Sequence, residues 1–191
     1  VQLFERVDQE LGPVTALVNN AGTIAPQSRL EDMSELRLLT LMKANVVGPM
    51  LCAKHALLRM ARRHGGQGGA IVNVSSMAAR LGSPGEYVDY AASKGALDTC
   101  TVGLAKEVVG EGVRVNGVRP GYIHTGFHAL SGDPDRVRKL ESGLPMGRGG
   151  QPEEVAEARV WVLSDKASYS TGRPEARRGG KEWRSRWAPY Y

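Results

Sequence analysis

The amino-acid sequence predicts an α/β fold built around a parallel β-sheet. Three short apolar stretches, residues 15–20, 70–75 and 113–118, have the composition of buried strands. Each of them ends in small or polar residues, and helical stretches separate them. Because strand and helix alternate along the chain, we expect a doubly wound parallel sheet with helices on both faces.

Apolar periodicity predicts the helices. Residues 1–11 have the pattern of the end of a helix, and a long helical region is expected over 31–63. A third helix is expected over residues 90–109, and a last one over 152–163, where proline suits the first turn. The remaining long segments, 77–89 and 121–150, are predicted to be loops, the second with a short helix near 135–141.

The composition is that of an ordinary globular domain. Of 191 residues, 41% are hydrophobic and 24% are charged. We find no apolar run close to the roughly 20 residues that span a bilayer and no leader peptide, so we expect a cytoplasmic protein without a membrane partner. Both cysteines, Cys52 and Cys100, fall in predicted helices, which fits a reducing compartment.

The net charge of +5 is concentrated at one end of the chain. Residues 173–191 hold six basic and two acidic residues, so this tail carries +4 and residues 1–172 carry +1. The domain itself therefore has no basic excess of the kind that binds nucleic acid. Nucleic-acid binding through the Arg-rich and Trp-containing tail is a remote alternative.

Tyr90 and Lys94 are four residues apart in a predicted helix, so their side chains share one face. A cation beside a phenol favours the phenolate and lowers the pKa of the phenol. Such a tyrosine could donate or accept a proton near neutral pH. Taken alone, most pairs of this kind are solvated helix surface.

Ser76 follows strand 70–75 and precedes Tyr90 by fourteen residues. Ligands of open α/β sheets bind outside the carboxyl ends of the strands, so this hydroxyl is a candidate for the same site. The structural alternative is a hydroxyl that caps the next segment. Ser75 is expected to point to the opposite side by strand alternation, and Tyr87 lacks a lysine four residues later.

These features form a series of motifs in a fixed order. The chain contains Asn19-Asn20-Ala21-Gly22, Asn45, Ser76, Tyr90-Ala91-Ala92-Ser93-Lys94 and Pro120-Gly121-Tyr122-Ile123-His124-Thr125. In this order and at this spacing they resemble the short-chain dehydrogenase/reductases. The resemblance runs from about residue 1 to Gly172. It implies a Rossmann-like domain over 1–172, with strand 70–75 between strands 15–20 and 113–118. The remaining residues, 173–191, are expected to form a basic irregular tail.

The resemblance implies a catalytic tetrad. Tyr90 would exchange a proton with the substrate oxygen, and Ser76 would hydrogen-bond the same oxygen. Lys94 would lower the pKa of Tyr90 and bind the ribose hydroxyls of the cofactor. Asn45 would hold a water that links Lys94 to solvent.

The resemblance also implies NAD or NADP as the cofactor. Two groups of small or polar residues would contact it: Asn20, Ala21 and Gly22 on the adenosine side, and Pro120, Gly121, Ile123 and Thr125 beside the nicotinamide. No metal is expected, because His124 and His128 have glycine between them and no third ligand nearby.

The glycine-rich phosphate loop of the family is missing from this sequence. The run 65–69 is rich in glycine but precedes a strand, whereas a phosphate loop follows one. We therefore expect an incomplete, N-terminally truncated sheet that lacks the first strands, the glycine-rich loop and the segment that selects NAD or NADP. The tail after Gly172 also departs from the family's final apolar strand, and we expect it not to form a buried central strand.

For the full-length parent, the resemblance implies an oxidoreductase that interconverts a secondary alcohol and a ketone. We expect small-molecule alcohols and ketones as partners and a homo-oligomeric full-length form. The alternative is an inactive truncated fragment that retains the tetrad on a broken scaffold. On this reasoning, the 191-residue chain is expected to bind cofactor poorly.

Overall fold

The structure, a computed structural model, describes residues 2–177. One parallel sheet has the order β1-β2-β3-β4. Its strands are β1 (Ala16–Asn19), β2 (Gly69–Val74), β3 (Val113–Pro120) and β4 (Pro174–Arg177). The α/β class, the parallel pairing and the central position of β2 among the three predicted strands are confirmed, and the architecture is an incomplete Rossmann-like fold.

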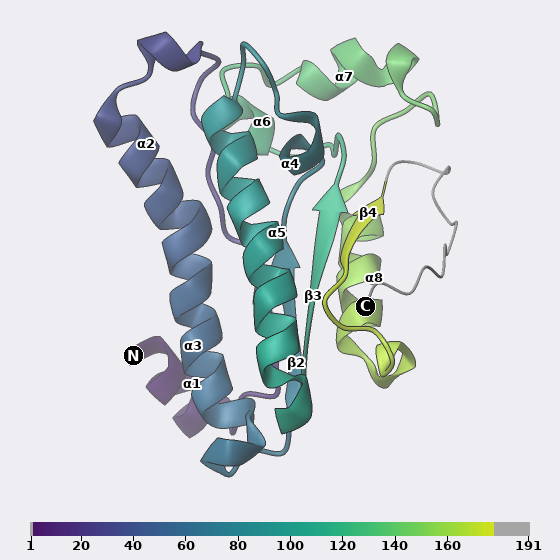
Figure 1. The fold of residues 1–191 in the computed structure, drawn as a ribbon. Helices are drawn as coiled ribbons and strands as arrows, with labels where there is room; N and C mark the ends of the chain where they lie inside the picture. Colours follow the sequence, from purple (N-terminus) through teal and green to yellow (C-terminus); the bar gives the residue numbers. More distant parts are fainter. Residues whose placement is uncertain (1, 178–191) are drawn as a thin grey trace.

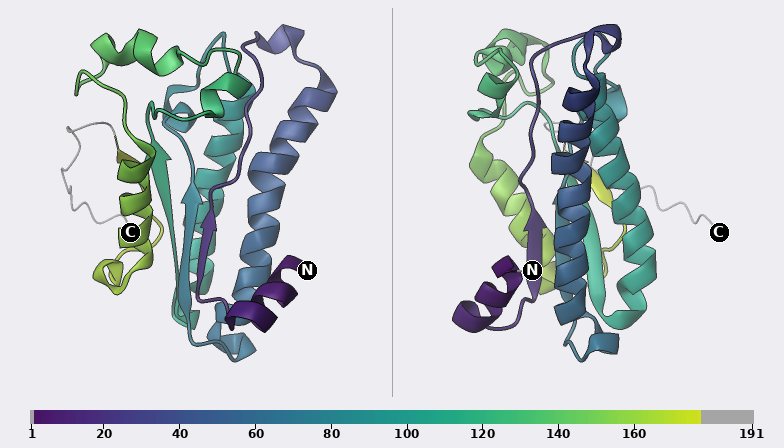
Figure 2. Two further views of the ribbon diagram at one scale, coloured as in Figure 1. Left: turned by 180° about the vertical axis from the view of Figure 1, so that it is seen from behind. Right: turned by 90° about the vertical axis from the view of Figure 1, so that its left-hand side faces the viewer.

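The helices connect the strands and cover both faces of the sheet (Figures 1 and 2). They are α1 (Gln2–Leu11), α2 (Glu35–Met42), α3 (Gly48–Met60), α4 (Ala78–Leu81), α5 (Val88–Val108), α6 (Phe127–Leu130), α7 (Arg136–Leu140) and α8 (Pro152–Leu163). The first face of the sheet packs against α3 and α5, around the buried side chains of Ile71 and Val115. On the second face, Val72 and Val118 pack against Ala158 and Val162 of α8.

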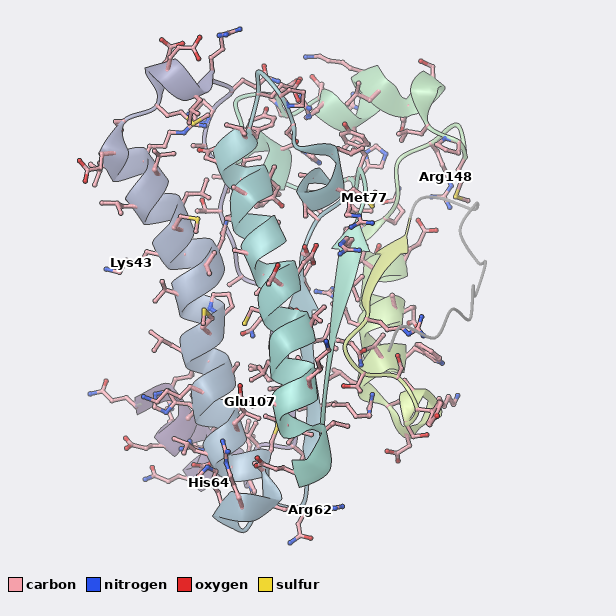
Figure 3. All side chains as sticks on the ribbon, in the orientation of Figure 1. Lys43, Arg62, His64, Met77, Glu107 and Arg148 are labelled. Carbon is pink, nitrogen blue, oxygen red and sulfur yellow. The ribbon has the colours of Figure 1, made fainter. Side chains whose placement is uncertain are left out.

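A single turn of π-helix, Lys43–Val47, joins α2 to α3, so that residues 35–60 form one long helix (Figure 1). By length and composition this helix could cross a membrane, so the expectation that no segment qualifies is wrong. Charged residues such as Lys43 and Lys54 interrupt the apolar stretch, so residues 35–60 contain no unbroken apolar run of the length that spans a bilayer. Core helices of globular proteins pass the same test. In this fold Ala56 and Met60 are fully buried, while Lys43 projects away from the sheet (Figure 3).

The start of the C-terminal tail is not irregular as expected. Residues Pro174–Arg177 form β4, parallel to β3 at the edge of the sheet. The nitrogen of Gly117 donates to the carbonyl oxygen of Arg173 at 2.9 Å, at the start of this pairing. Backbone pairing does not require apolar side chains, and proline is tolerated at the first position of an edge strand. The rest of the tail, with both of its tryptophans, lies outside the described residues.

A buried ladder of polar side chains ties β1 and β2 to α5 beneath the carboxyl ends of the strands. Asn19 Nδ2 donates to Asn73 Oδ1 at 2.8 Å, and Asn73 Nδ2 donates to Thr101 Oγ1 at 2.8 Å. Thr101 Oγ1 in turn donates to the carbonyl of Leu97 at 2.8 Å. Since every member has a partner, the ladder fixes the strands against the helix without leaving buried polar atoms unpaired.

Arg114 of β3 holds the end of α8. Its guanidinium donates to the carbonyl oxygens of Val162, Leu163, Ser164 and Ala167, at 2.9, 3.0, 3.2 and 3.0 Å. The last carbonyls of a helix have no partner inside the helix and carry partial negative charge. The Arg114 guanidinium supplies both hydrogen-bond donors and a positive charge to these carbonyls.

We expect Arg114→Ala to lower the free energy of unfolding by about 2–3 kcal/mol, because several helix-end carbonyls lose a charged donor. Urea unfolding followed by circular dichroism measures the change. The matched control is Arg138→Ala, whose side chain is 78% exposed, and which should change stability by less than about 0.5 kcal/mol. Equal stability of the two variants would contradict the capping role.

Candidate active site

The carboxyl ends of the strands open into a cleft with a volume of about 490 Å³. It is lined by every sequence-predicted site residue except Asn45: Asn20, Ala21, Gly22, Ser76, Tyr90, Lys94, Pro120, Gly121, Ile123 and Thr125. These residues come from four separate stretches of the chain. The parallel sheet brings them together, as expected for an open α/β fold.

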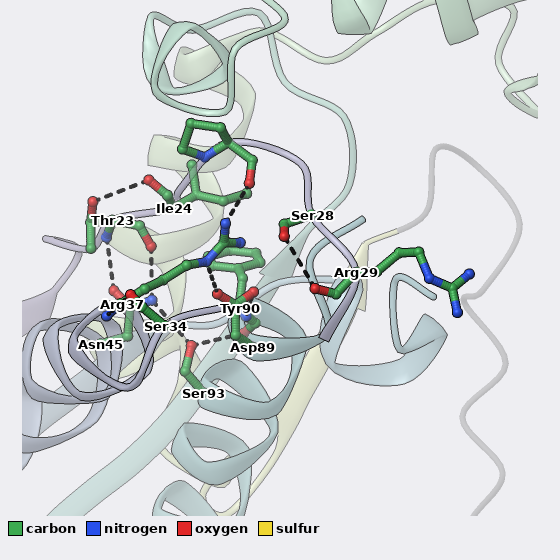
Figure 4. Close-up of polar contacts among 11 residues, drawn as sticks. Thr23, Ile24, Ser28, Arg29, Ser34, Arg37, Asn45, Asp89, Tyr90 and Ser93 are labelled. Carbon is green, nitrogen blue, oxygen red and sulfur yellow. Dashed lines mark hydrogen bonds and ion pairs between the residues drawn. The ribbon is translucent and has the colours of Figure 1, made fainter. Parts of the chain in front are cut away.

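Tyr90 stands in the first turn of α5, in a segment fixed by ion pairing. Asp89 Oδ1 accepts a hydrogen bond from the Tyr90 nitrogen at 2.8 Å, and Asp89 Oδ2 pairs with Arg37 Nε of α2 at 2.8 Å (Figure 4). The Tyr90 ring packs beside that of Phe127, with ring centroids 5.9 Å apart. The phenol is thus held by two helices and by the segment that follows β3.

The electrostatics of Tyr90 differ from the sequence expectation. Burial raises the pKa of Tyr90 to about 12, and its hydrogen bond with Ser76 offsets only part of this effect. The predicted lowering by Lys94 is therefore wrong for the protein as described. The Lys94 ammonium lies 5.8 Å from the centroid of the phenol ring, and its hydrogen bond goes elsewhere. Desolvation, which disfavours the phenolate, outweighs the cation at that distance.

Lys94 is almost fully enclosed and has one strong partner. Its Nζ donates to the carbonyl oxygen of Val74, at the end of β2, at 2.8 Å. Burial lowers the pKa of Lys94 to about 8, against the opposing effect of the Asp98 carboxylate one turn further along α5. The ammonium is therefore fixed in position but is easier to deprotonate than a surface lysine.

Asn45 lies behind the cleft, in the π-turn, and is fully buried. Its Oδ1 accepts from the Thr23 nitrogen at 2.8 Å, while its Nδ2 donates to the Thr23 carbonyl at 2.8 Å and to Ser93 Oγ at 3.1 Å (Figure 4). The amide thus clamps the loop after β1 to α5. Its predicted role in holding a water stays a prediction.

Ser76 combines the two alternatives that its sequence position left open. Its Oγ accepts from the Ala78 nitrogen at 3.1 Å, at the start of α4, and the hydroxyl also acts to lower the pKa of Tyr90. The hydroxyl is therefore both a cap and a neighbour of the phenol. Ser75 Oγ instead donates to the carbonyl of Lys94, on the α5 side of β2.

Gly22 makes the closest approach to the buried amide and ammonium. A Cβ atom at this position would lie 3.2 Å from Asn45 Oδ1 and 3.3 Å from Lys94 Nζ. Only glycine therefore leaves these two groups undisturbed. Small residues on one side and an ammonium on the other suit a dinucleotide cofactor, because the backbone can approach it closely and Lys94 can donate to its hydroxyl groups.

Several cleft residues were not predicted from the sequence. Tyr87, Tyr122, Phe127, His128 and Arg136 all line the cleft. The spacing of Tyr87, three residues before Tyr90, was the one available signal, since i,i+3 neighbours share a helix face. The others lie after β3, at Tyr122 and in the short helices α6 and α7, where no sequence periodicity predicts the direction of a side chain. His124, which the sequence places with His128 as a possible metal ligand, instead pairs with Glu141 at 2.9 Å. No group of three or more potential metal ligands occurs within residues 2–177.

Comparison with known proteins agrees with this geometry. A family profile described as enoyl-(acyl carrier protein) reductase matches residues 1–180. The chain belongs to the short-chain dehydrogenase/reductase family. The sequence-based resemblance is thereby confirmed, and with it the general class of NAD(P)-dependent oxidoreductases.

Three relatives of this short-chain dehydrogenase/reductase illustrate the identity and the coverage of the matches. The uncharacterized oxidoreductase YgfF of Escherichia coli K12 is 56% identical over 95% of this chain and 73% of its own length. The glucose and ribitol dehydrogenase homolog of Oryza sativa is 40% identical, over 84% of this chain and 54% of the relative. The NADPH-dependent aldehyde reductase 1 of Arabidopsis thaliana is 33% identical, over 94% and 60%. The chain thus spans between about half and three quarters of these proteins.

We expect Gly22→Ala to reduce turnover by about tenfold to hundredfold, because the new methyl group displaces the Asn45 amide or the Lys94 ammonium by a few tenths of an ångström. Steady-state kinetics with a ketone and NADH or NADPH measure the effect. The matched control is Gly103→Ala, where a Cβ has open space within α5. This control should keep full turnover and gain slightly in stability, and a Gly22→Ala variant as active as the control would contradict the packing argument.

The burial of Lys94 predicts a pH dependence of stability. The unfolded chain keeps this proton up to a pKa of 10.5, whereas the folded protein keeps it only up to a pKa of about 8. Unfolding therefore takes up a proton between these values, so stability should rise from pH 8 to pH 10.5, by up to about 3 kcal/mol. Urea unfolding of the wild type and of Lys94→Met across this range isolates the effect. The stability of Lys94→Met should not rise over this pH range. If the stabilities of the wild type and the variant change with pH in parallel, the buried Lys94 is not the cause.

Proposed function

We propose that this protein interconverts a secondary alcohol and a ketone, with NAD or NADP as the hydride carrier. The observation that carries the proposal is the convergence of the Tyr90 phenol, the Ser76 hydroxyl and the Lys94 ammonium on one cleft at the ends of β2 and α5. A phenol and a hydroxyl that line the same part of a cleft can both reach one substrate oxygen. The bound cofactor would supply or accept the hydride at the carbon.

The residues of this chain account for the proton. In ketone reduction, Tyr90 donates its proton to the oxygen as negative charge develops there, and Ser76 donates a hydrogen bond to the same atom. The raised pKa of Tyr90, about 12, keeps the phenol protonated at neutral pH, which is the state that reduction requires. Alcohol oxidation requires the phenolate, so the oxidative direction should need higher pH or a closer cation.

Cofactor binding involves the two ends of the cleft. Lys94 would donate to the ribose hydroxyls, since its ammonium has donors left beyond the one used on Val74. Asn20, Ala21 and Gly22 would approach the adenosine side, and the backbone around Pro120 and Ile123 the nicotinamide. The name of the Arabidopsis relative supports NADPH.

A second candidate is a chain that retains the catalytic side chains without turnover. It is favoured by the coverage of the relatives, of which this chain spans as little as 54%. It is also favoured by the outer edge of β1, which pairs with no further strand among residues 2–177. Assays of the purified 191-residue chain with NADH and NADPH over a panel of ketones separate the two candidates.

We expect Tyr90→Phe to cut ketone reduction by at least about a hundredfold, because it removes the proton donor and keeps the ring. Circular dichroism should show an unchanged fold. The matched control is Tyr169→Phe, which removes the hydroxyl of a side chain that is 95% exposed and should keep wild-type turnover. If Tyr90→Phe and Tyr169→Phe are equally active, Tyr90 is not the donor. If the wild type itself is inactive with both cofactors, the second candidate holds.

A further inference from the structure

A second polar cluster lines the cleft and has no part in the proton transfer. At its centre is Arg136, the first residue of α7. Its guanidinium carbon lies 5.1 Å from the ring centroid of Tyr87 and 5.9 Å from that of Tyr122. Glu86 holds the guanidinium with two bonds, of 3.2 Å to Nη1 and 2.5 Å to Nη2. A cation placed between two aromatic rings and paired with a carboxylate has one fixed orientation.

Tyr87 is the most unusual member of this cluster. It precedes Tyr90 by one turn at the start of α5 and packs with it in one apolar cluster. Only 3% of Tyr87 is exposed, yet its hydroxyl makes no hydrogen bond with any part of the chain that the structure describes. A buried hydroxyl without a partner destabilises a protein, so it calls for an explanation in terms of function.

The backbone that presents Tyr87 is strained as well. Ser83 has a φ of 46°, in the left-handed region that disfavours side chains other than glycine. Its carbonyl oxygen accepts from the Tyr87 nitrogen at 3.1 Å, so this turn sets the start of α5. Two local costs, the strained turn and the unpaired hydroxyl, thus fall on one wall of the cleft, which is typical of a ligand-binding site.

We infer that Tyr87 and Arg136 recognise a second oxygen atom of the substrate, and that the substrate is a neutral, hydroxylated ketone or alcohol. The inference rests on the proposed function and names its substrate class. A substrate oxygen would accept a hydrogen bond from the Tyr87 hydroxyl or from the N–H groups of Arg136 that Glu86 leaves free. A plain hydrocarbon ketone would leave these donors desolvated and unpaired.

The charges around the cluster favour a neutral group over a carboxylate. Glu86 already neutralises Arg136, and it would repel a second anion brought to the same guanidinium. The other polar side chains of this part of the lining are Ser83, Tyr122, His128 and Ser131. Burial lowers the pKa of His128, so its ring stays uncharged at neutral pH. The lining around Arg136 is therefore neutral apart from the Arg136–Glu86 pair and rich in hydrogen-bonding groups, whereas the cations Lys94 and Arg159 lie elsewhere in the cleft lining.

The test uses a matched series of ring ketones: cyclohexanone, its monohydroxylated isomers, and the oxocyclohexanecarboxylate with the acid opposite the ketone. We measure kcat/KM for each, with NADH and with NADPH, in the wild type, Tyr87→Phe and Arg136→Gln. The wild type should prefer at least one hydroxylated isomer over cyclohexanone by roughly fivefold to tenfold, the contribution of one hydrogen bond. Tyr87→Phe should remove most of that preference, and the control Tyr169→Phe should retain it.

Two kinetic results would overturn the inference. The first is a Tyr87→Phe variant that keeps the full preference for hydroxylated ketones. The second is a wild type that prefers the carboxylate, with that preference lost in Arg136→Gln, which would show an anionic substrate instead.

A binding measurement separates this inference from the proposed function. Saturation-transfer NMR on the 191-residue chain compares cyclohexanol with the cyclohexanediols and needs no turnover. If no ketone is reduced but Tyr87→Phe weakens diol binding selectively, the proposed function fails and the recognition site stands. Equal binding of cyclohexanol and the diols would overturn the inference.

The melting temperature of the free protein supplies a last control. Because the Tyr87 hydroxyl has no partner, Tyr87→Phe should leave the melting temperature unchanged or raise it. A clear fall would show that the hydroxyl has a structural role, and would overturn the assignment to substrate binding.

Discussion

The bond from the Lys94 ammonium to the carbonyl oxygen of Val74 is the interaction on which the site depends. It joins the last residue of β2 to the face of α5 that carries Lys94, and it fixes a charge inside the protein. The neighbouring residues accommodate this buried group: position 22 is glycine, because a side chain would press on the ammonium. The Asn45 amide supports the same loop from behind. Strand end, helix and loop are therefore held in register by one charged hydrogen bond and its surroundings.

Burial gives the site its chemical character. The same exclusion of water raises the pKa of Tyr90 and lowers that of Lys94, so both groups are shifted toward their uncharged forms. A phenol that stays protonated is a proton donor, whereas a lysine of lowered pKa is a hydrogen-bonding group whose charge responds to its neighbours. An anionic ligand beside Lys94 would raise the pKa of the lysine and keep it protonated over a wider pH range. The protonation states of Tyr90 and Lys94 therefore depend on the charge of the ligand in the cleft.

Much of this could be predicted from the sequence. The strands followed from three apolar stretches, and their order followed from the family resemblance. The shared face of Tyr90 and Lys94 followed from their spacing. The pKa of Tyr90 could not be predicted from the sequence. The spacing of residues predicts which way a side chain points but not how deeply it is buried, and burial determined the sign of the pKa shift. The pairing of β4 depends on the open backbone edge of β3 rather than on its own side chains. Arg136 reaches the cleft through an irregular segment, where only tertiary contacts fix the direction of a side chain.

The π-turn at Lys43–Val47 has a consequence for how this sequence can vary. A π-turn holds one residue more than an α-helical turn, and each residue of an α-helix advances its face by about 100°. Deleting one residue here would leave a continuous helix but would rotate everything after it. Ala56 and Met60 would turn away from the sheet, and exposed leucines would turn toward it. The extra residue of the π-turn and the apolar pattern of α3 therefore depend on each other, and neither can change length alone.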